Sequence, residues 1–461
     1  MKHEDIKILN NNNEYIGKLV NVCGWIRTIR KSKNMCFIEI NDGTSLKNLQ
    51  LVFDLSKGFD LNNLNTGTSI AVNGILVYSK NNIQNIELNV QNFQVLGNCP
   101  KDYPIQKKKQ NLESLREYPH LRTRTNTFNA AFRIRSVIVQ SIFDYLQKND
   151  FIYVNSPIIT GSNCEGAGEM FRVTTLNIND ISYNSYNDDL DNDDFFGKRV
   201  NLTVSGQLEA EAMACSLGKV FTFGPSFRAE NSNTKRHAAE FWLFEPEMAF
   251  TNLNETIIFV NKMIKHIFDK LINECWDELY FFNKYYDNSL LEKLTSVINN
   301  EFVNLDYMDA INILLNSNVH FEFPVYYGCD LKYEHLKYIT DKIYNRPVYI
   351  INYPKDFKPF YIKLNPDGKT VASADLYFPG IGDIIGISQK EDNFDLLNTR
   401  IKELNMTEED YYWYLDLRKY GSVEHSGFGL GVERLMMYVT GLENIRDTIA
   451  FPRTKCKKLK L

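Results

Sequence analysis

The sequence lacks several features that define whole classes of protein. No run of about 18 apolar residues occurs, so we expect no membrane-spanning helix. Charges stand at Lys2, Glu4 and Asp5, where a secretory signal would need apolar residues. The eight cysteines are scattered and form no C-x-x-C pair, which disfavours a zinc site or a disulfide framework. We therefore expect reduced thiols and a cytoplasmic protein.

An excess of positive charge is also absent. The chain has 57 acidic and 52 basic residues, a formal net charge of −5, which disfavours a protein that coats DNA but allows a local basic face. Apolar residues make up 44% and aromatic residues 13% of the chain, which is a globular composition. A length of 461 residues predicts two large domains or about three smaller ones.

The first 98 residues predict a small β domain. Runs of β-branched and aromatic residues are separated by turn residues, and Asn41-Asp42-Gly43 is a strong turn signal. Five short strands in this length are typical of the oligonucleotide-binding barrel, although another small β domain is the alternative. The expected strands run over 19–29, 36–40, 49–53, 69–77 and 86–96.

The segments that follow differ in character. Residues 99–126 form a proline-punctuated basic linker, whose charges either lie on solvated surface or contact a polyanion. Apolar residues repeat at helical spacing over 127–148, which predicts an amphipathic helix. A strand over 152–159 is interrupted by Pro157, which requires an edge, a bulge or a boundary. Residues 177–198 are an acidic, Asn-rich loop.

A strand, a polar loop and a second strand are predicted between residues 221 and 247. At the open end of such a hairpin, an arginine fork suits a phosphate and an aromatic face suits a purine ring. A carboxylate can accept a hydrogen bond from an exocyclic amine. The alternative is a surface hairpin whose charges pair with one another. The side chains expected at the open end are Arg228, Glu230, His237 and Phe241.

Two glycine-rich segments carry further charges. Asp375 and Asp383 either hold hydrated Mg²⁺ against phosphate oxygens or act as caps beside tightly packed glycines. Residues 427–435 predict a strand entering a helix, where a ligand can approach the backbone and Arg434 can lie along it. This Gly-x-Gly-x-Gly element lacks the last glycine and the β-α-β context of a dinucleotide fold.

Together, these three segments resemble motif 2, the metal loop and motif 3 of the class II aminoacyl-tRNA synthetases. The helix that ends at residues 154–157 resembles motif 1. Three further stretches, 162–171, 202–208 and 420–427, resemble the asparaginyl branch of the family in its bacterial form. The likeness extends over nearly the whole chain, from residue 24 to residue 454.

The resemblance implies an α+β fold with an anticodon-binding barrel over 1–98 and a catalytic domain over 127–461. The catalytic domain is expected to contain an antiparallel six-stranded sheet flanked by helices. ATP and L-asparagine would form asparaginyl-adenylate with release of pyrophosphate, and the asparaginyl group would pass to the 3′ end of tRNA(Asn). Motif 1 implies a homodimer, and no membrane or DNA partner is expected.

The resemblance also implies the roles of residues in the ATP site. Arg228 is expected at the α-phosphate, and Arg434 and His237 at the γ-phosphate region. Arg228 and Arg434 are the expected catalytic residues, because positioning and charge neutralisation supply most of such a reaction. Phe241 is expected to stack on adenine. The remaining ATP-binding residues are Glu230, near the adenine amino group, and Gly431.

The amino-acid pocket is expected to bind both ends of asparagine. Glu165 and Gln207 are the expected partners of the α-amino group. The side-chain amide has donors and an acceptor, so the pocket should present groups of each kind. Glu211 is expected to accept from the amide NH₂, and Lys390 to donate to its carbonyl.

The sequence departs from the family pattern at three positions near this chemistry. Asp375 and Asp383 are the expected Mg²⁺ ligands, but the family usually has Glu at 383. Lys390 stands where Arg is usual, which replaces a planar fork by a point charge. Ile387 stands where Gly is usual, which stiffens the loop.

The barrel is expected to contact the tRNA through three side chains. Phe37 is expected to stack on a splayed anticodon base, with plain core packing as the alternative. Gln50 is expected to bond a base edge, and Arg27 to contact a phosphate.

Three other functions are compatible with the motifs. An aspartyl-tRNA synthetase, discriminating or nondiscriminating, shares the barrel and the motifs, but a bacterial one would carry a large extra domain and a side-chain-binding Lys near Ala210. A non-tRNA amide ligase on the same catalytic fold has no anticodon to read. A catalytically silent RNA-binding paralogue would not need to keep Arg228, Glu230 and Arg434.

Overall fold

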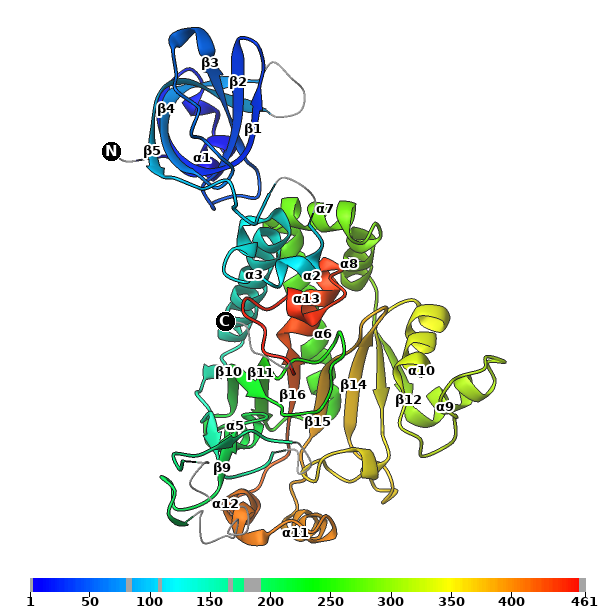
Figure 1. Cartoon of the computed structure of the whole chain (residues 1–461). Helices are drawn as coiled ribbons and strands as arrows, with labels where there is room; N and C mark the ends of the chain where they lie inside the picture. Colours follow the sequence, from blue (N-terminus) through cyan, green and yellow to red (C-terminus); the bar gives the residue numbers. More distant parts are fainter. Residues whose placement is uncertain (1–2, 80–84, 107–109, 165–168, 178–191, 456–461) are drawn as a thin grey trace. The chain divides into compact units, whose positions relative to one another are not determined.

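The computed structural model is divided into two compact units, Met1–Phe132 and Arg133–Leu461 (Figure 1). The boundary falls within helix α3 (Asn126–Lys148), which the sequence predicted over 127–148. None of the helices in the described part of the chain combines the length and apolarity that a bilayer crossing requires. The residues described are 3–79, 85–106, 110–164, 169–177 and 192–455.

The first unit contains a closed barrel with strand order β1-β2-β3-β5-β4. All neighbours are antiparallel except β3 and β5, which are parallel. The five strands predicted from sequence are all present, and the oligonucleotide-binding fold is confirmed. The strands are β1 (Leu19–Lys31), β2 (Met35–Asn41), β3 (Leu49–Asp54), β4 (Ser69–Tyr78) and β5 (Ile86–Gly97).

The barrel core follows from alternation along the strands. In β4, every second residue from Ile70 to Leu76 is buried, because successive side chains of a strand point to opposite faces. The ring of Phe53 lies in this core, with Phe59 and Phe93 at centroid distances of 5.3 and 5.5 Å. Three short helices complete the barrel: α1 (Ile6–Asn11), η1 (Asn13–Tyr15) and η2 (Leu55–Lys57).

The segment predicted as a basic linker, 99–126, is folded where it is described. It contains α2 (Leu112–Leu115) and η3 (Arg122–Arg124). The guanidinium carbon of Arg122, a fully buried side chain, lies 4.2 Å from the centre of the Phe128 ring. Apolar side chains of this segment form a small core with Phe128 of α3; they are Cys99, Tyr103, Ile105 and Leu115.

The second unit is built on an eight-stranded sheet of order β12-β13-β14-β15-β16-β11-β10-β6. The six strands from β13 to β10 are antiparallel, as predicted, and β12 and β6 each add one parallel strand at an edge. The strands are β6 (Ile152–Tyr153), β10 (Lys219–Phe227), β11 (Glu240–Ala249), β12 (Val303–Asp306), β13 (Val348–Ile351), β14 (Ser373–Phe378), β15 (Gly382–Gln389) and β16 (His425–Gly431).

Pro157 divides the strand predicted over 152–159 into β6 and β7, which belong to different sheets. A small second sheet has the order β7-β9-β8, with β7 (Ile159–Thr160), β8 (Arg172–Val173) and β9 (Val200–Leu202). Most of the predicted acidic loop 177–198 lies outside the described residues.

Helices cover the large sheet. Helices α6 and α13 pack against β15 and β16, and α5 packs against β10 and β11. The helices of this unit are α5 (Gln207–Leu217), α6 (Leu253–Glu274), α7 (Trp276–Tyr285), α8 (Leu290–Asn299), α9 (Tyr307–Leu315), α10 (Tyr333–Lys337), α11 (Phe394–Glu403), α12 (Glu408–Lys419) and α13 (Val432–Thr440). Shorter turns are η5 (Tyr338–Tyr344), η6 (Lys355–Phe357) and η7 (Ile445–Asp447). Gly441, with φ of +67°, ends α13 as predicted.

Gly427 of β16 lies so close to a side chain of the neighbouring strand that no larger residue fits there. Gly427 lies opposite Glu247 of β11, and a Cβ atom at 427 would lie 2.2 Å from the Glu247 carboxyl carbon. Glu247 Oε1 is 3.1 Å from Nζ of Lys390, and neither side chain has any exposed surface. A larger residue at 427 would therefore displace a buried ion pair.

We expect Gly427→Ala to lower the free energy of unfolding by about 1–3 kcal/mol, because the added methyl group overpacks a buried charge pair. Chemical denaturation followed by fluorescence measures this loss. Gly429→Ala on the same strand is the matched control, since no atom lies within 4 Å of a Cβ there. Its cost should stay below about 1 kcal/mol; equal losses in the two variants would contradict the packing described here.

Candidate active site

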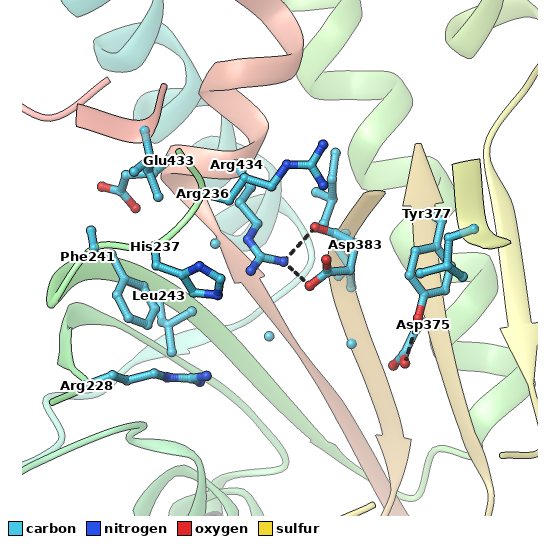
Figure 2. A pocket seen from close by; sticks show the side chains of 18 of the residues that line it. Arg228, Arg236, His237, Phe241, Leu243, Asp375, Tyr377, Asp383, Glu433 and Arg434 are labelled. Carbon is cyan, nitrogen blue, oxygen red and sulfur yellow. Dashed lines mark hydrogen bonds and ion pairs between the residues drawn. The ribbon is translucent and has the colours of Figure 1, made fainter. Parts of the chain in front are cut away.

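A cavity of about 450 Å³ in the second unit brings the predicted ATP and metal residues together. Its walls come from the β10–β11 hairpin, the β14–β15 hairpin and the junction of β16 with α13 (Figure 2). Segments far apart in the sequence therefore meet at one place. The predicted residues that line the cavity are Arg228, Glu230, His237, Phe241, Asp375, Asp383, Gly431 and Arg434.

The hairpin presents an arginine and an aromatic ring to the cavity. Arg228 follows β10, and its guanidinium carbon lies 5.4 Å from the centre of the Phe241 ring on β11. Its Nη1 is 3.9 Å from Oε1 of Glu230, a long ion pair between partly exposed side chains. The charges of the hairpin thus face a cavity rather than only one another, which suits a phosphate and a flat base.

His237 is held by hydroxyl groups of the loop between these strands. Its Nδ1 lies 2.6 Å from Oγ1 of Thr234 and 3.2 Å from Oγ of Ser232. Burial lowers the pKa of His237, Glu230 opposes the shift, and the positive charge of Arg434 adds to it. The imidazole is therefore favoured in its neutral form near pH 7.

Arg434 pairs with one of the two candidate metal ligands. Its Nη1 donates to the carboxylate of Asp383 and, at 3.2 Å, to the Asp383 carbonyl oxygen (Figure 2). Burial lowers the pKa of Arg434 to about 10, and the nearby positive charges of Arg228 and Arg236 contribute to the shift. A guanidinium in this setting gains from any additional negative charge.

Glu433, next to Arg434, fixes the start of α13. Its Oε2 accepts from the backbone N–H of Trp242 at 3.1 Å, and its Oε1 accepts from Nη2 of Arg135 at 2.7 Å. These contacts join α13 to β11 and to α3. Sequence reasoning missed this pair, although a Glu directly before the predicted catalytic Arg was a signal for it.

Asp375 lies across the cavity from Arg228 (Figure 2). Its Oδ2 is 2.5 Å from Nζ of Lys358 and accepts from the Tyr377 hydroxyl at 3.3 Å. Within the described ranges, no group of three or more His, Cys, Asp or Glu side chains could hold a metal ion. Two carboxylates at one cavity still fit the way Mg²⁺ binds, because it needs only one or two besides phosphate oxygens.

Glu211, the predicted acceptor for the asparagine amide, is fully buried on α5. Its Oε2 accepts from the Tyr414 hydroxyl at 2.5 Å and from Nη2 of Arg418 at 3.1 Å, and it lies 3.2 Å from Nε2 of His425. Burial opposes ionisation, but His425, Arg418 and Lys390 together lower the pKa of Glu211 to about 2. Glu211 is therefore a carboxylate at neutral pH.

Gln207 lies one helical turn before Glu211. Its Nε2 donates to Oε1 of Glu211 at 3.1 Å, and its Oε1 accepts from the Tyr361 hydroxyl at 3.3 Å. Glu165, the other residue predicted for the α-amino group, lies outside the described residues.

Lys390 is buried behind the same region. Its Nζ donates to Oγ of Ser388 at 2.9 Å and pairs with Glu247, as described above. Burial raises the pKa of Glu247, and the positive charge of Lys390 opposes the shift and favours the carboxylate. The sequence did not predict Glu247 as the partner of Lys390, because β11 and the residue that follows β15 are far apart in the chain.

The three predicted tRNA-binding residues occupy different environments in the barrel. Phe37 is half-buried on the outer side of β2, between the core residues Cys36 and Ile38. Gln50 is buried: its Nε2 donates to Glu87 at 3.2 Å, and its Oε1 accepts from Arg30 at 3.3 Å.

Arg27 lies where the pairing of β1 with β2 shifts register, between Ile26 and Thr28. Burial lowers its pKa, Tyr103 opposes the shift, and Arg124 adds to it. Arg27 therefore sits close to the segment that follows the barrel in sequence.

Two models of known protein families match the chain, one over the barrel and one over the residues that follow it. Residues 111–455 match the model of tRNA synthetases class II (D, K and N), and residues 20–96 match that of the OB-fold nucleic acid binding domain. An asparagine–tRNA ligase of Clostridium kluyveri is 48% identical over 98% of this chain and 99% of its own length. That of Clostridium tetani is 50% identical over the same shares.

A solved structure is similar over the whole length. Asparaginyl-tRNA synthetase from Pyrococcus horikoshii, complexed with asparaginyl-adenylate, matches with a TM-score of 0.87 and 30% identity, covering 100% of both chains. The shared cavity of Arg228 and Arg434, the two family matches and these full-length relatives lead to one conclusion: the chain belongs to the class II tRNA synthetases of the D, K and N group.

Proposed function

We propose that the chain is an asparagine–tRNA ligase, which activates L-asparagine with ATP and transfers it to the 3′ end of tRNA(Asn). The observation that carries this proposal is the meeting of Arg228 and Arg434 in one cavity with Phe241. Relatives about half identical over nearly the full chain support the amino acid and the tRNA.

Each cavity residue binds a different part of ATP during adenylate formation. Phe241 stacks on adenine, and Glu230 accepts from its amino group. Arg228 binds the α-phosphate, where the carboxylate of asparagine attacks, and His237 and Arg434 bind the γ-phosphate region. The asparagine carboxylate is the nucleophile and pyrophosphate is the leaving group, so no protein nucleophile is required. The protein needs only to position the two substrates and to neutralise the charge on the phosphates.

Asp383 and Arg434 exchange partners when ATP binds. In this structure the two side chains pair with each other. A phosphate oxygen would take the place of the carboxylate on Arg434. Asp383, together with Asp375, would then hold Mg²⁺, which would further neutralise phosphate charge.

The charge of Glu211 selects asparagine over aspartate. An ionised carboxylate accepts from the NH₂ of the asparagine amide but repels the carboxylate of aspartate. Lys390 donates to the amide carbonyl, and Gln207 and Glu165 bind the α-amino group. The ionised Glu211 disfavours the alternative of an aspartyl enzyme, and the barrel disfavours an amide ligase without tRNA.

The barrel reads the anticodon. The half-buried Phe37 is available for stacking on its outer side, and Gln50 is already oriented by Arg30 and Glu87 for bonding to a base edge. Arg27 contacts a phosphate. The seven cysteines in the described ranges are free thiols, which supports a reducing, cytoplasmic location.

The active unit is a homodimer formed through the region of β6 and β7. Strand β6 is an edge of the large sheet. Apolar side chains around it are 40–47% exposed: Ile152, Tyr153, Ile158 and Ile159. An exposed apolar group beside an open sheet edge suits a second copy of the chain.

We expect ATP–pyrophosphate exchange to depend on asparagine, with kcat/KM for aspartate lower by about 100-fold or more, since aspartate places a second carboxylate beside Glu211. Exchange assays across the amino acids measure this ratio. Comparable exchange with aspartate would contradict the proposed specificity.

Arg228→Ala should reduce kcat/KM for exchange by about 10²–10³-fold, because the α-phosphate loses its fork. Phe37→Ala should leave exchange within about twofold of the unmodified protein and weaken tRNA charging about tenfold, the value of one stacked base. Exchange and charging measured on both variants test this division of labour, which fails if both variants lose exchange equally.

Sedimentation of the unmodified protein should give twice the mass of the chain, and Ile159→Asp should give single chains, because a charge would be buried in the interface. Leu315→Asp on α9 is the matched control, since Leu315 is 57% exposed far along the chain from β7. A single-chain mass for the unmodified protein would overturn the dimer.

A further inference from the structure

A lysine outside the three signature motifs contacts one of the two candidate metal ligands. Lys358 follows η6, in the connection between β13 and β14, and it is not part of the lining of the ATP cavity. Its Nζ lies 2.5 Å from Oδ2 of Asp375. The two side chains are only 14% and 18% exposed, so water and salt screen this ion pair weakly. Lys358 therefore neutralises the charge of Asp375.

Buried tyrosines hold the ammonium group of Lys358 in this place. Its Nζ lies 4.2 Å from the centre of the Tyr353 ring, which attracts a cation without cancelling its charge. The Tyr353 hydroxyl is 2.8 Å from the Tyr377 hydroxyl, and the latter donates to Oδ2 of Asp375 at 3.3 Å. Because Tyr353 and Tyr377 are both buried, the ammonium and the carboxylate share a rigid support.

The second oxygen of Asp375 is left for the cavity. Among the residues that the structure describes, the hydrogen bonds and the ion pair of this carboxylate are made by Oδ2. A Cβ atom at Gly386, which lines the cavity, would lie 3.5 Å from Oδ1. Gly386 therefore leaves room beside Oδ1, where a divalent cation can be bound. Charge, rather than space, limits such binding.

Both candidate metal ligands carry a cation of the protein. Lys358 pairs with Asp375, and Arg434 pairs with Asp383. The four side chains together have no net charge, whereas a divalent cation needs an excess of negative charge at its ligands. A phosphate that binds Arg434 would free Asp383 and supply that excess. It would leave the pair of Lys358 and Asp375 intact.

We propose that Lys358 is a resident counter-ion of Asp375 that lowers the affinity of the two aspartates for a divalent cation, so that the cation binds together with ATP and not before it. This inference rests on the proposed function and adds to it a control on metal binding. The control comes from the connection between β13 and β14, which none of the three signature motifs includes.

The test is the affinity of the protein for Mn²⁺ without nucleotide, followed by the electron paramagnetic resonance signal of the free ion. Lys358→Met should lower the Kd for Mn²⁺ about tenfold, because it removes a positive charge beside the metal ligands. Lys358→Gln, which is neutral but keeps a hydrogen-bond donor, should give the same gain. Lys358→Arg keeps the charge and should stay within about threefold of the unmodified protein. A purely structural ion pair predicts the opposite sign, since its loss would disturb Asp375 and weaken the binding of Mn²⁺.

The gain in affinity should depend on Asp375. Asp375→Asn in the Lys358→Met background should return the Kd to within about threefold of that of the unmodified protein. A gain that survives this change would come from another part of the protein and would overturn the inference. Lys355→Met is the matched control, because Lys355 belongs to the same turn but its Nζ is 3.9 Å from Oε2 of Glu403. Its Kd should stay within about twofold.

The binding of Mn²⁺ and the exchange reaction separate this inference from the proposed function. Unchanged or weaker binding of Mn²⁺ in both neutral variants of Lys358, with asparagine-dependent exchange intact in the unmodified protein, would overturn the inference and leave the proposed function standing. A tenfold gain in a protein without asparagine-dependent exchange would support the counter-ion and contradict the proposed function.

Discussion

The concentration of positive charge in one cavity is the constraint on which the rest of this site depends. Arg228, Arg236 and Arg434 all line it, and their like charges, together with burial, destabilise the cationic form of Arg434. Two of the three guanidinium groups contact the rings of Phe241 and Tyr333, which hold a cation without neutralising it. The cavity therefore presents three guanidinium groups to a polyanion, although Arg228 also lies near Glu230 and Arg434 pairs with Asp383.

The charged side chains around Glu211 are buried, so each of them needs a partner of opposite charge. Glu211 is compensated by Arg418 and His425, and Lys390 by Glu247. A buried charge without a partner costs several kcal/mol, so each of these groups is held in one place. A fixed pattern of charge is what separates a neutral amide from a carboxylate of the same shape. The two regions thus differ in burial: the first presents partly exposed guanidinium groups, and the second holds its charged groups out of contact with solvent.

Much of the fold was predictable because local patterns determine it. Runs of β-branched and aromatic residues between turn residues located all five barrel strands, and the glycine-rich strand before Val432 located the start of α13. The meeting of Arg228, Phe241 and Arg434 at one cavity was predictable because sequence motifs carry them. The contacts of Arg135 with Glu433, Lys390 with Glu247 and Arg236 with Tyr333 were not predictable, since each joins segments that are far apart in the chain and meet only in the folded structure.

Contacts with neighbouring residues also explain why Asp383 and Lys390, which depart from the family pattern, are compatible with the site. At 383 a shorter carboxylate still reaches Arg434, because the turn before it is held through Gly380 by Tyr333 and Asp341. At 390 an ammonium cannot form the bidentate contact of a guanidinium, but Ser388 and Glu247 fix it as a point charge. In both cases, neighbouring residues fix the orientation of the substituted side chain. Under the proposed function, selectivity then depends less on Lys390 than on the ionised Glu211, whose charge the surrounding network maintains.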